Sequence, residues 1–483
     1  MFIATTITHM ITPLVVPTPP PTTTTQASPH NAHNDLLVPD FGASSRQSTI
    51  AVAVINLMAT IVGGGVLSLP WAFSRLGIGT ATVLMLLAGY ATAESLHLLC
   101  LSARFTGASS YGEVGRLAFG PAMETLVALL LGVFLLFVLV AYQVLLRDIW
   151  TPLVVFVLGY TNQDGINGNV VLAVLLILLG PFVVQYNLHA LRYNCFVGFV
   201  SVSILCVALC HHAFWGTFPT HYDNDNHVDG TTPLYFTDQL ADWLVAFPII
   251  ALSFLSHFNI LPLQAALIQP SRQRTRQMID VAVLGCGLLM YLFGLGGYVY
   301  AGADTKGNIL LNLTAEASRN DPLFMLGRMG VGITIMVATP VMALPCRENL
   351  LEVVEILLGQ EDQLETTLIG EQTALLRTEP IQKDPLQLDP LWHYGSTLII
   401  MLITYAAAAA VPGVAVVWSL CGSSMAFLIA FILPAAYFLQ ISRREHVVES
   451  HHRGRIVFCW VLLVVSVVGA VACTLQTVLQ MFH

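Results

Sequence analysis

Long apolar stretches recur along the whole chain of 483 residues, and they constrain the fold more than any other feature. An α-helix needs about 20 apolar residues to cross the hydrocarbon core of a bilayer. We count eleven such stretches, at about 48–70, 78–101, 122–146, 168–188, 193–215, 240–262, 278–302, 323–346, 394–412, 414–440 and 456–481. Charged residues make up 10% of the chain, whereas a soluble domain carries about 25%. We therefore predict an all-α polytopic membrane protein with about eleven transmembrane helices.

Two hydrophilic segments flank or interrupt the apolar part. Residues 1–47 are rich in Pro, Thr, Ser, Asn and Asp and have no helical periodicity, so we expect a disordered cytosolic N-terminal tail. Residues 347–393 form an acidic insert, which we also expect on the cytosolic side and partly helical. The remainder, 48–481, is predicted to form one membrane domain.

The distribution of Lys and Arg predicts the orientation. With the N-terminus in the cytosol, fourteen of the 19 basic residues fall on the cytosolic side and five on the outer side. The five outer residues are Arg75, Arg147, Lys306, Arg319 and Arg328. The chain's glycosylation sequon, Asn312-Leu313-Thr314, falls in a loop that this topology places outside, so we expect a glycoprotein modified at Asn312.

The first apolar segment contains three successive glycines, Gly63–Gly65. Small residues in a membrane helix either allow close helix packing or break the helix where it faces a cavity. The sixth segment is interrupted as well, by Pro248, His257 and Pro262. Interruptions in corresponding segments of two halves are a sequence sign of a binding site in a protein with inverted repeats. We expect repeats of five helices at about 48–215 and 240–440, with an extra helix at about 456–481.

Four short motifs occur in order on four of the predicted helices. The first segment has Asn56, six residues, then Gly-Gly-Gly-Val-Leu-x-Leu-Pro, and the sixth has Phe254-x-x-His257 followed by Pro262. The eighth ends in Pro340-x(4)-Pro345-x-Arg347, and the tenth contains Ser419-Leu-Cys-Gly-Ser and Phe431-Ile-Leu-Pro. Together these motifs resemble those of the amino acid/auxin permease family, and the resemblance covers about 48–481. It implies a LeuT-type fold and secondary active transport of amino acids by alternating access.

The resemblance and the broken helices together suggest site residues. Glycine lets a carboxylate approach the backbone, and a half-helix N-terminus attracts an anion. We expect Gly63, Gly64 and Gly65, with Thr60 beside them, to hold the substrate carboxylate. Ser253, Phe254 and Ser256 are expected to contact the substrate amine and shape the pocket, with ordinary core serines as the alternative.

The coupling ion, H⁺ or Na⁺, is left open. The family's sodium-coupled branch reads Asn-Ala where this chain has Ala59 and Thr60. The polar or ionisable residues at membrane depth that we consider as coupling candidates are Asn56, His257, Thr339 and Glu94. His257 has a structural role as its alternative, and Glu94 is three residues before His97, with which it is expected to pair.

Other classes of function receive no support from the chain. We find no nucleophile–base set or metal motif at membrane depth, no phosphate-binding loop and no basic run with interleaved aromatics. We therefore expect no enzyme, no cofactor, no metal and no nucleic-acid partner. Histidines and aspartates near 211–229 lack a metal-ligand spacing, and the nine cysteines form no evident disulfide framework.

Two alternatives within the same class stay open. The chain is an amino acid sensor if the pocket signals through the tail or the 347–393 insert. It is a facilitative permease for arginine or lysine if Glu94, Asp148 or Asp242 accepts a cationic side chain. The partners expected in every case are an amino acid and the lipid bilayer, and we expect the plasma membrane rather than an organelle.

Overall fold

Helices form almost all of the part of the chain that the structure describes, because a backbone in hydrocarbon must satisfy its hydrogen bonds within its own segment. The computed structural model describes residues 46–157, 167–185, 194–215, 235–313, 321–366, 390–444 and 453–482. These residues lie in one compact unit, Val38–His483. Within them the only β-type pairing is an isolated bridge between Ser48 and Leu267.

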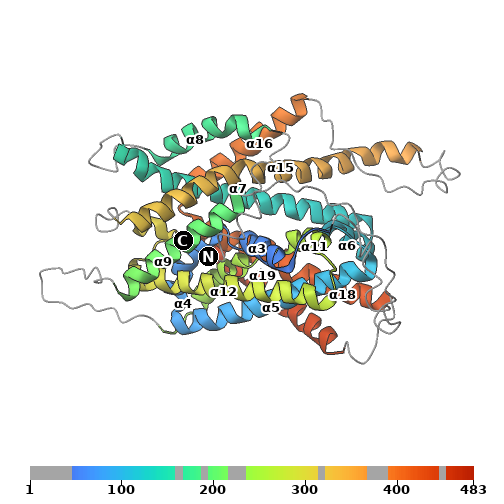
Figure 1. The fold of residues 1–483 in the computed structure, drawn as a ribbon. Coiled ribbons are helices and arrows are strands. Elements are labelled where there is room, and N and C mark those ends of the chain that lie inside the picture. The colour runs from blue at the N-terminus through green and yellow to red at the C-terminus, as the bar shows by residue number, and fades with distance from the viewer. Residues whose placement is uncertain are drawn as a thin grey trace, which may run out of the picture. The chain divides into compact units, whose positions relative to one another are not determined.

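The helices follow the predicted apolar segments (Figure 1). The first half contains α3 (Ile50–Ile61), the 3₁₀ turn η1 (Gly64–Ser68), α4 (Leu69–Leu76), α5 (Ile78–Thr106), α6 (Tyr111–Phe119), α7 (Pro121–Val157), α8 (Gly168–Val183) and α9 (Asn194–Phe214). The second half contains α10 (Leu240–Ser253), α11 (His257–Ala266), α12 (Arg272–Ala301), η4 (Gly302–Asp304), α13 (Ile309–Asn312), α15 (Pro322–Thr366), α16 (Pro390–Ala410), α17 (Val414–Cys421), η6 (Gly422–Ala426), η7 (Leu428–Ile432) and α18 (Leu433–Arg444). The last helix is α19 (Arg453–Phe482).

The described residues contain fewer full-length spans than the predicted eleven. Among the described residues, nine helices are long and apolar enough to cross a membrane, and the bent pair of α3 with η1 and α4 adds a tenth. The fourth predicted span corresponds to α8, which at 16 residues falls short of a full crossing. The count of eleven is therefore not confirmed, although a helix occupies each predicted segment.

Two helices exceed their predicted ends. Helix α7 runs to Val157, beyond the predicted boundary at 146. Helix α15 runs to Thr366, so the first part of the expected 347–393 insert is helical. Residues 367–389 of that insert lie outside the described residues.

The spanning helices pack as two groups. In the first group α12 contacts α3, α4 and α5, α10 packs against α4 and α5, and α11 packs against α3 and α5. In the second group α7 and α15 have the most extensive contact in the protein, and α8 and α16 join them; Figure 1 shows these four together. Helices α9 and α17 each contact both groups. This arrangement leaves the first and sixth segments facing α7 and α15.

The first and the sixth segments are both broken, as the sequence predicts. The axis bends by 49° between Ile50–Ile61 and Gly64–Leu76. In the sixth segment α10 ends at Ser253 and α11 begins at His257. Pro248 lies inside α10 and Pro262 inside α11, so neither proline marks the break itself.

The chain just before α3 is attached to the end of α11. The Arg46 guanidinium donates hydrogen bonds to the carbonyl oxygens of Gln264 and Ala265, at 3.2 and 2.8 Å. The Ser48 amide donates to the carbonyl of Ala266 at 2.9 Å. These contacts tie the start of the first broken segment to the end of the second. Residues 1–45 of the expected tail lie outside the described residues.

The contact between η6 and α10 tests this packing. A Cβ on Gly422 would lie 2.3 Å from the carbonyl oxygen of Pro248, which is backbone and has little freedom to move. We expect Gly422→Ala to destabilise the protein by about 1–3 kcal/mol, the usual cost of overpacking. The midpoint of thermal unfolding in detergent should fall, while Gly180→Ala, whose Cβ meets nothing within 4 Å, should leave it unchanged or raise it slightly. Equal midpoints for the two variants would contradict the packing described.

Candidate functional site

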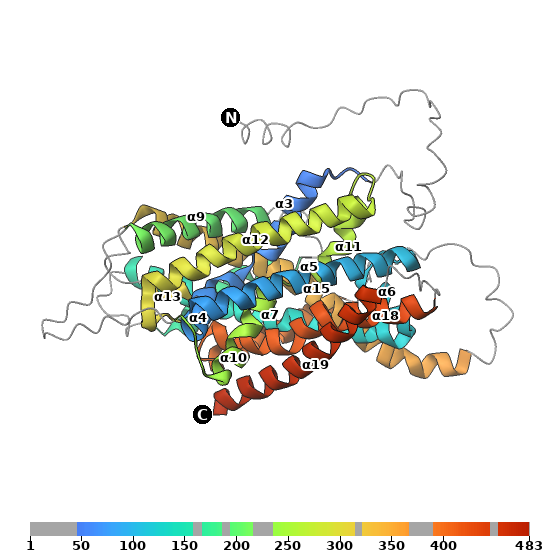
Figure 2. The ribbon, with the colours of Figure 1, turned by 90° about the horizontal axis from the view of Figure 1, so that it is seen from below.

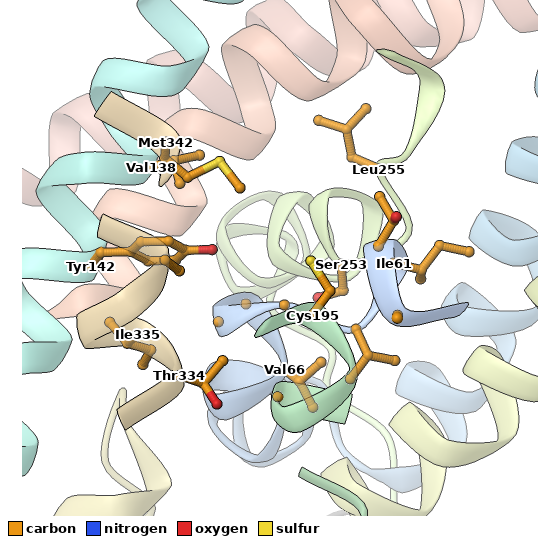
Figure 3. A pocket seen from close by; sticks show the side chains of 18 of the residues that line it. Ile61, Val66, Val138, Tyr142, Cys195, Ser253, Leu255, Thr334, Ile335 and Met342 are labelled. Carbon is orange, nitrogen blue, oxygen red and sulfur yellow. The ribbon is translucent and has the colours of Figure 1, made fainter. Parts of the chain in front are cut away.

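A cavity of about 180 Å³ lies where the two breaks face the second group of helices. Its walls come from the end of α3, η1, α7, α9, the α10–α11 break, α15 and α17. Figure 3 shows Tyr142 reaching from one wall toward Ser253 and Cys195, with Thr334 and Met342 beside it on α15. The site therefore draws on segments from both halves of the chain.

The break in the first segment leaves backbone groups of opposite polarity at the cavity. The amide of Gly63 bonds back to Ile61 at 3.0 Å instead of continuing the α-helix. Among the described residues, the amides of Gly64 and Gly65 at the start of η1 have no hydrogen-bond acceptor. The carbonyl end of α3 carries partial negative charge and the amide end of η1 carries partial positive charge. A zwitterion matches this pair of helix ends.

The three glycines differ in what surrounds them. None has a positive φ, so their role concerns space rather than backbone conformation. A Cβ on Gly63 would meet nothing within 4 Å, because this residue opens onto the cavity. A Cβ on Gly64 would lie 3.2 Å from both Tyr142 and Leu145, so this position lets α7 approach. The packing and binding-site interpretations of the glycines therefore apply to different residues of the run.

Two hydroxyls at the breaks are arranged as acceptors. Thr60 donates its hydroxyl proton to the carbonyl of Asn56 at 2.9 Å, and Ser253 donates to the carbonyl of Ile249 at 2.8 Å. Both residues line the cavity. With their protons engaged, their oxygens keep lone pairs for a donor such as an ammonium group. Thr60 thus presents an acceptor oxygen to the cavity beside the glycines, and its contact with a substrate stays a prediction.

Two of the predicted pocket residues point elsewhere. Phe254 does not line the cavity, because its ring packs against Gly89 of α5 and Gly287 of α12 and is 1% exposed. Ser256 is fully buried outside the cavity, and its hydroxyl has no hydrogen-bond partner among the described residues. One residue's difference in position along the break decides whether a side chain faces the cavity or the neighbouring helices.

The four ion-coupling candidates do not come together. Asn56 and Thr339 lie outside the cavity wall, and the Thr339 hydroxyl bonds to the carbonyl of Ile335 at 2.8 Å. His257, the first residue of α11, is fully buried, and its Nε2 lies 3.2 Å from the Ser95 hydroxyl oxygen. Glu94 lies in a second cavity, 2.9 Å from Arg276.

The predicted pairing of Glu94 with His97 is wrong. The i, i+3 spacing does place both on one face of α5, but α12 supplies better partners. Glu94 pairs with Arg276, and His97 lies 3.5 Å from the carboxylate of Asp280. A neighbouring helix with complementary charge outweighs a weak pairing along one helix.

None of the described residues lining the larger cavity is charged. The other two carboxylates considered for a cationic substrate also lie elsewhere. Asp148 is 3.6 Å from Arg147, and Asp242 is 3.5 Å from Arg75.

Several cavity residues lie outside the sequence motifs from which the site was predicted. Tyr142 and Val138 on α7, Cys195 on α9, and Thr334 on α15 were not among the predicted site residues. Trp418 of α17 contacts Tyr142 edge to face at 6.5 Å, and its indole nitrogen is buried without a partner among the described residues. An aromatic or polar residue inside an apolar segment was the available signal, but helical periodicity alone does not say which face meets the cavity.

The remaining predictions concern metal ligands, the glycosylation of Asn312 and the cysteines. No group of three or more potential metal ligands is found within the described ranges. His212 lies 2.6 Å from Asp321, whereas His221 and His227 lie outside the described residues. Both amide atoms of Asn312 bond to backbone groups, of Lys306 and Asp304, and its glycosylation stays a prediction. All nine cysteines are free.

Known proteins resemble this chain over nearly its whole length. The family model described as "Transmembrane amino acid transporter protein" matches residues 46–479. Vacuolar amino acid transporter 6 of Saccharomyces cerevisiae is 22% identical over 86% of this chain and 97% of its own. Amino acid transporter AVT6E of Arabidopsis thaliana is 22% identical over 90% and 85%. Vacuolar amino acid transporter 5 of the same yeast is 22% identical over 81% and 88%.

A solved structure shares the fold. The nucleobase-cation-symport-1 family transporter Mhp1 superimposes with a TM-score of 0.50 at 12% identity, covering 92% of this chain and 95% of its own. With the two broken helices in corresponding positions, this likeness supports a LeuT-type fold.

Cys195 provides a chemical probe of the cavity. It is the one exposed cysteine of the nine, seven others are buried, and Cys210 is intermediate. We expect a small maleimide to modify Cys195 first in the purified protein, and Cys195→Ser to remove that fast phase. Mass spectrometry of digested protein measures the modified sites. Cys210→Ser is the matched control, and a fast phase that follows Cys210 instead would contradict the assigned accessibility.

Proposed function

Because the chain belongs to the family of transmembrane amino acid transporter proteins, we propose that it is a secondary active transporter that carries neutral amino acids by alternating access. Transport of amino acids across a membrane follows from the family. The uncharged cavity at the two helix breaks carries the finer proposal, because it offers one site for a zwitterion and no partner for a charged side chain.

The two breaks orient the substrate. The carboxylate binds the open amides of Gly64 and Gly65 at the start of η1, where Gly63 leaves room for it. The ammonium group binds at the carbonyl ends of α3 and α10, beside the oxygens of Thr60 and Ser253. The side chain of the substrate then extends toward the apolar wall of α7 and α15, which includes Val138.

The charge distribution favours a neutral side chain. A buried ion without a partner costs several kcal/mol in real proteins, even after relaxation. Glu94, Asp148 and Asp242 each pair with an arginine away from the cavity, so they do not serve as acceptors for lysine or arginine. We therefore favour neutral substrates over the cationic alternative.

His257 is the group we propose for proton coupling. Ser95 donates its hydroxyl proton to the carbonyl of Ala430, so Ser95 accepts from Nε2 of His257. This hydrogen bond fixes the neutral tautomer with its proton on Nε2 and leaves Nδ1, which has no partner among the described residues, as a proton acceptor. No charged side chain in the described part of the chain pairs with His257. Because His257 starts α11, its charge can bias the hinge that borders the substrate.

The membrane we propose is that of an organelle. Two of the relatives are named as vacuolar transporters, and none of the comparisons supports the plasma membrane we expected. The positive-inside rule places the N-terminus in the cytosol. The proposed binding of the substrate carboxylate to the backbone amides does not depend on which organelle holds the protein.

Uptake by the purified protein in liposomes tests the substrate class. We expect radiolabelled leucine-type neutral amino acids to accumulate and arginine, lysine and glutamate to be taken up about a hundredfold less or not at all, because a charged side chain finds no partner. Leucinamide, which lacks the carboxylate, should compete about tenfold more weakly than leucine, because it loses a charge-assisted hydrogen bond.

Protection of Cys195 gives the matching binding measurement. A bound neutral amino acid should slow its alkylation, and arginine at the same concentration should not. Absence of uptake for every amino acid under every gradient would refute the transport proposal. Preferred uptake of arginine would leave transport standing and overturn the substrate class.

Proton coupling has its own test in His257→Gln. We expect the variant to keep amino acid exchange between the two sides of the liposome and to lose stimulation by an imposed pH gradient. Ser95→Ala is the control, since it removes the hydrogen-bond partner and leaves the imidazole in place. Unchanged stimulation in His257→Gln would show that another group couples the proton, and retained exchange shows that the variant is folded.

A further inference from the structure

A second, polar cavity of about 90 Å³ lies apart from the substrate site, where three helices begin or end. It lies between the last turns of α5 and the first turns of α12 and α19. Figure 2 shows that α5 ends and α12 begins at the same end of the helix bundle. Four arginines line it: Arg104, Arg272, Arg276 and Arg455. The lining of this cavity is thus rich in basic residues. The cavity lies near a membrane surface rather than at the centre of the bilayer.

Two of the four arginines are left without a carboxylate partner among the described residues. Arg276 is 2.9 Å from Glu94 and 3.3 Å from Asp280, so it engages both. Arg272 and Arg455 form no ion pair with any residue that the structure describes. The cavity therefore keeps an excess of positive charge, and the N-terminal ends of α12 and α19 add to it.

The wall also contains a buried hydroxyl that lacks a partner. Thr275 lines the cavity at 3% exposure, and its Oγ1 has no hydrogen-bond partner among the described residues. Leaving such a group unsatisfied costs about 1–3 kcal/mol. Arg104, at 6% exposure, lines the same cavity. Arg272, Arg455 and the Thr275 hydroxyl are hydrogen-bond donors around a small cavity, so they match a ligand group with several strong oxygen acceptors.

The surface next to the cavity is apolar. Just beyond Arg455 on α19, Val457 is 62% exposed, and Trp460 and Val461 are exposed as well. Tyr90 of α5 contacts Phe458 of α19 at 6.0 Å, which joins the two helices below the cavity. An anion bound at the arginines can therefore have hydrocarbon chains attached that lie along α19.

We propose that this cavity binds a phosphoryl group, supplied by the headgroup of an anionic phospholipid in the surrounding leaflet. Arg272 and Arg455 contact its oxygens from opposite walls, and Thr275 donates its hydroxyl proton from the floor. Basic pockets between membrane helices at a cytosolic surface are suited to such headgroups. Free inorganic phosphate has the same chemistry, and the experiment separates the two sources.

The test uses the full chain in nanodiscs and follows the midpoint of thermal unfolding. Phosphatidylcholine discs are compared with discs that also contain increasing amounts of a phosphatidylinositol phosphate, and inorganic phosphate is titrated into plain phosphatidylcholine discs. We expect a saturable rise of the midpoint with the anionic lipid. The double variant Arg272→Gln, Arg455→Gln should need about thirtyfold more lipid, because each arginine near an anionic surface contributes about fivefold. Thr275→Val should weaken the effect without changing the lipid-free midpoint much.

Arg274→Gln is the matched control, because Arg274 lies on the same turn of α12 outside the cavity and bonds to Gln269 at 3.4 Å. An equal loss in Arg274→Gln would show a general surface-charge effect and overturn the site. So would the absence of a saturable rise with both the lipid and inorganic phosphate. A rise with inorganic phosphate that disappears in the double variant supports the phosphoryl site and assigns it to the soluble ion.

Discussion

The need to satisfy backbone hydrogen bonds inside a membrane governs this protein. Nearly every described residue that spans the bilayer is helical, and the helix ladder is interrupted where it faces protein rather than lipid. The two sharp interruptions, after Ile61 and after Ser253, lie against each other and border one cavity. The open amides and carbonyls there are costly anywhere else. In this cavity they are the groups to which we propose that a zwitterion binds.

The rest of the site follows from what the breaks leave open. Gly64 has no side chain because Tyr142 and Leu145 of α7 come within contact of it. The hydroxyls of Thr60 and Ser253 donate to carbonyl oxygens of their own helices, so toward the cavity they can act only as hydrogen-bond acceptors. Tyr142 and Trp418 close the wall opposite the breaks. Backbone, hydroxyl and aromatic groups thus line the cavity, and none of its described lining residues is ionised.

The carboxylates considered for substrate or ion binding instead lie outside this cavity. Asp242 pairs with Arg75 near the start of α10, and Glu94 pairs with Arg276 near the surface where α12 begins. Burying a charge at the centre of the bundle is expensive, whereas near the surface it keeps some water and can be paired. This separation gives the protein an uncharged cavity at depth and a basic cavity at the surface. The two are chemically suited to different ligands.

The sequence by itself determined which segments are helical and that the first and sixth are interrupted, because apolar length, glycine runs and their position in two halves depend on local chemistry. It also indicated the backbone of Gly63–Gly65 as a binding element. Tertiary structure alone decided which side chains face the cavity. It turned Phe254 toward α5 and α12, brought Tyr142 and Cys195 in from α7 and α9, and gave Glu94 to Arg276 instead of His97. The physical reason is that helical spacing fixes which residues share a face, while only the packed neighbours fix what that face meets.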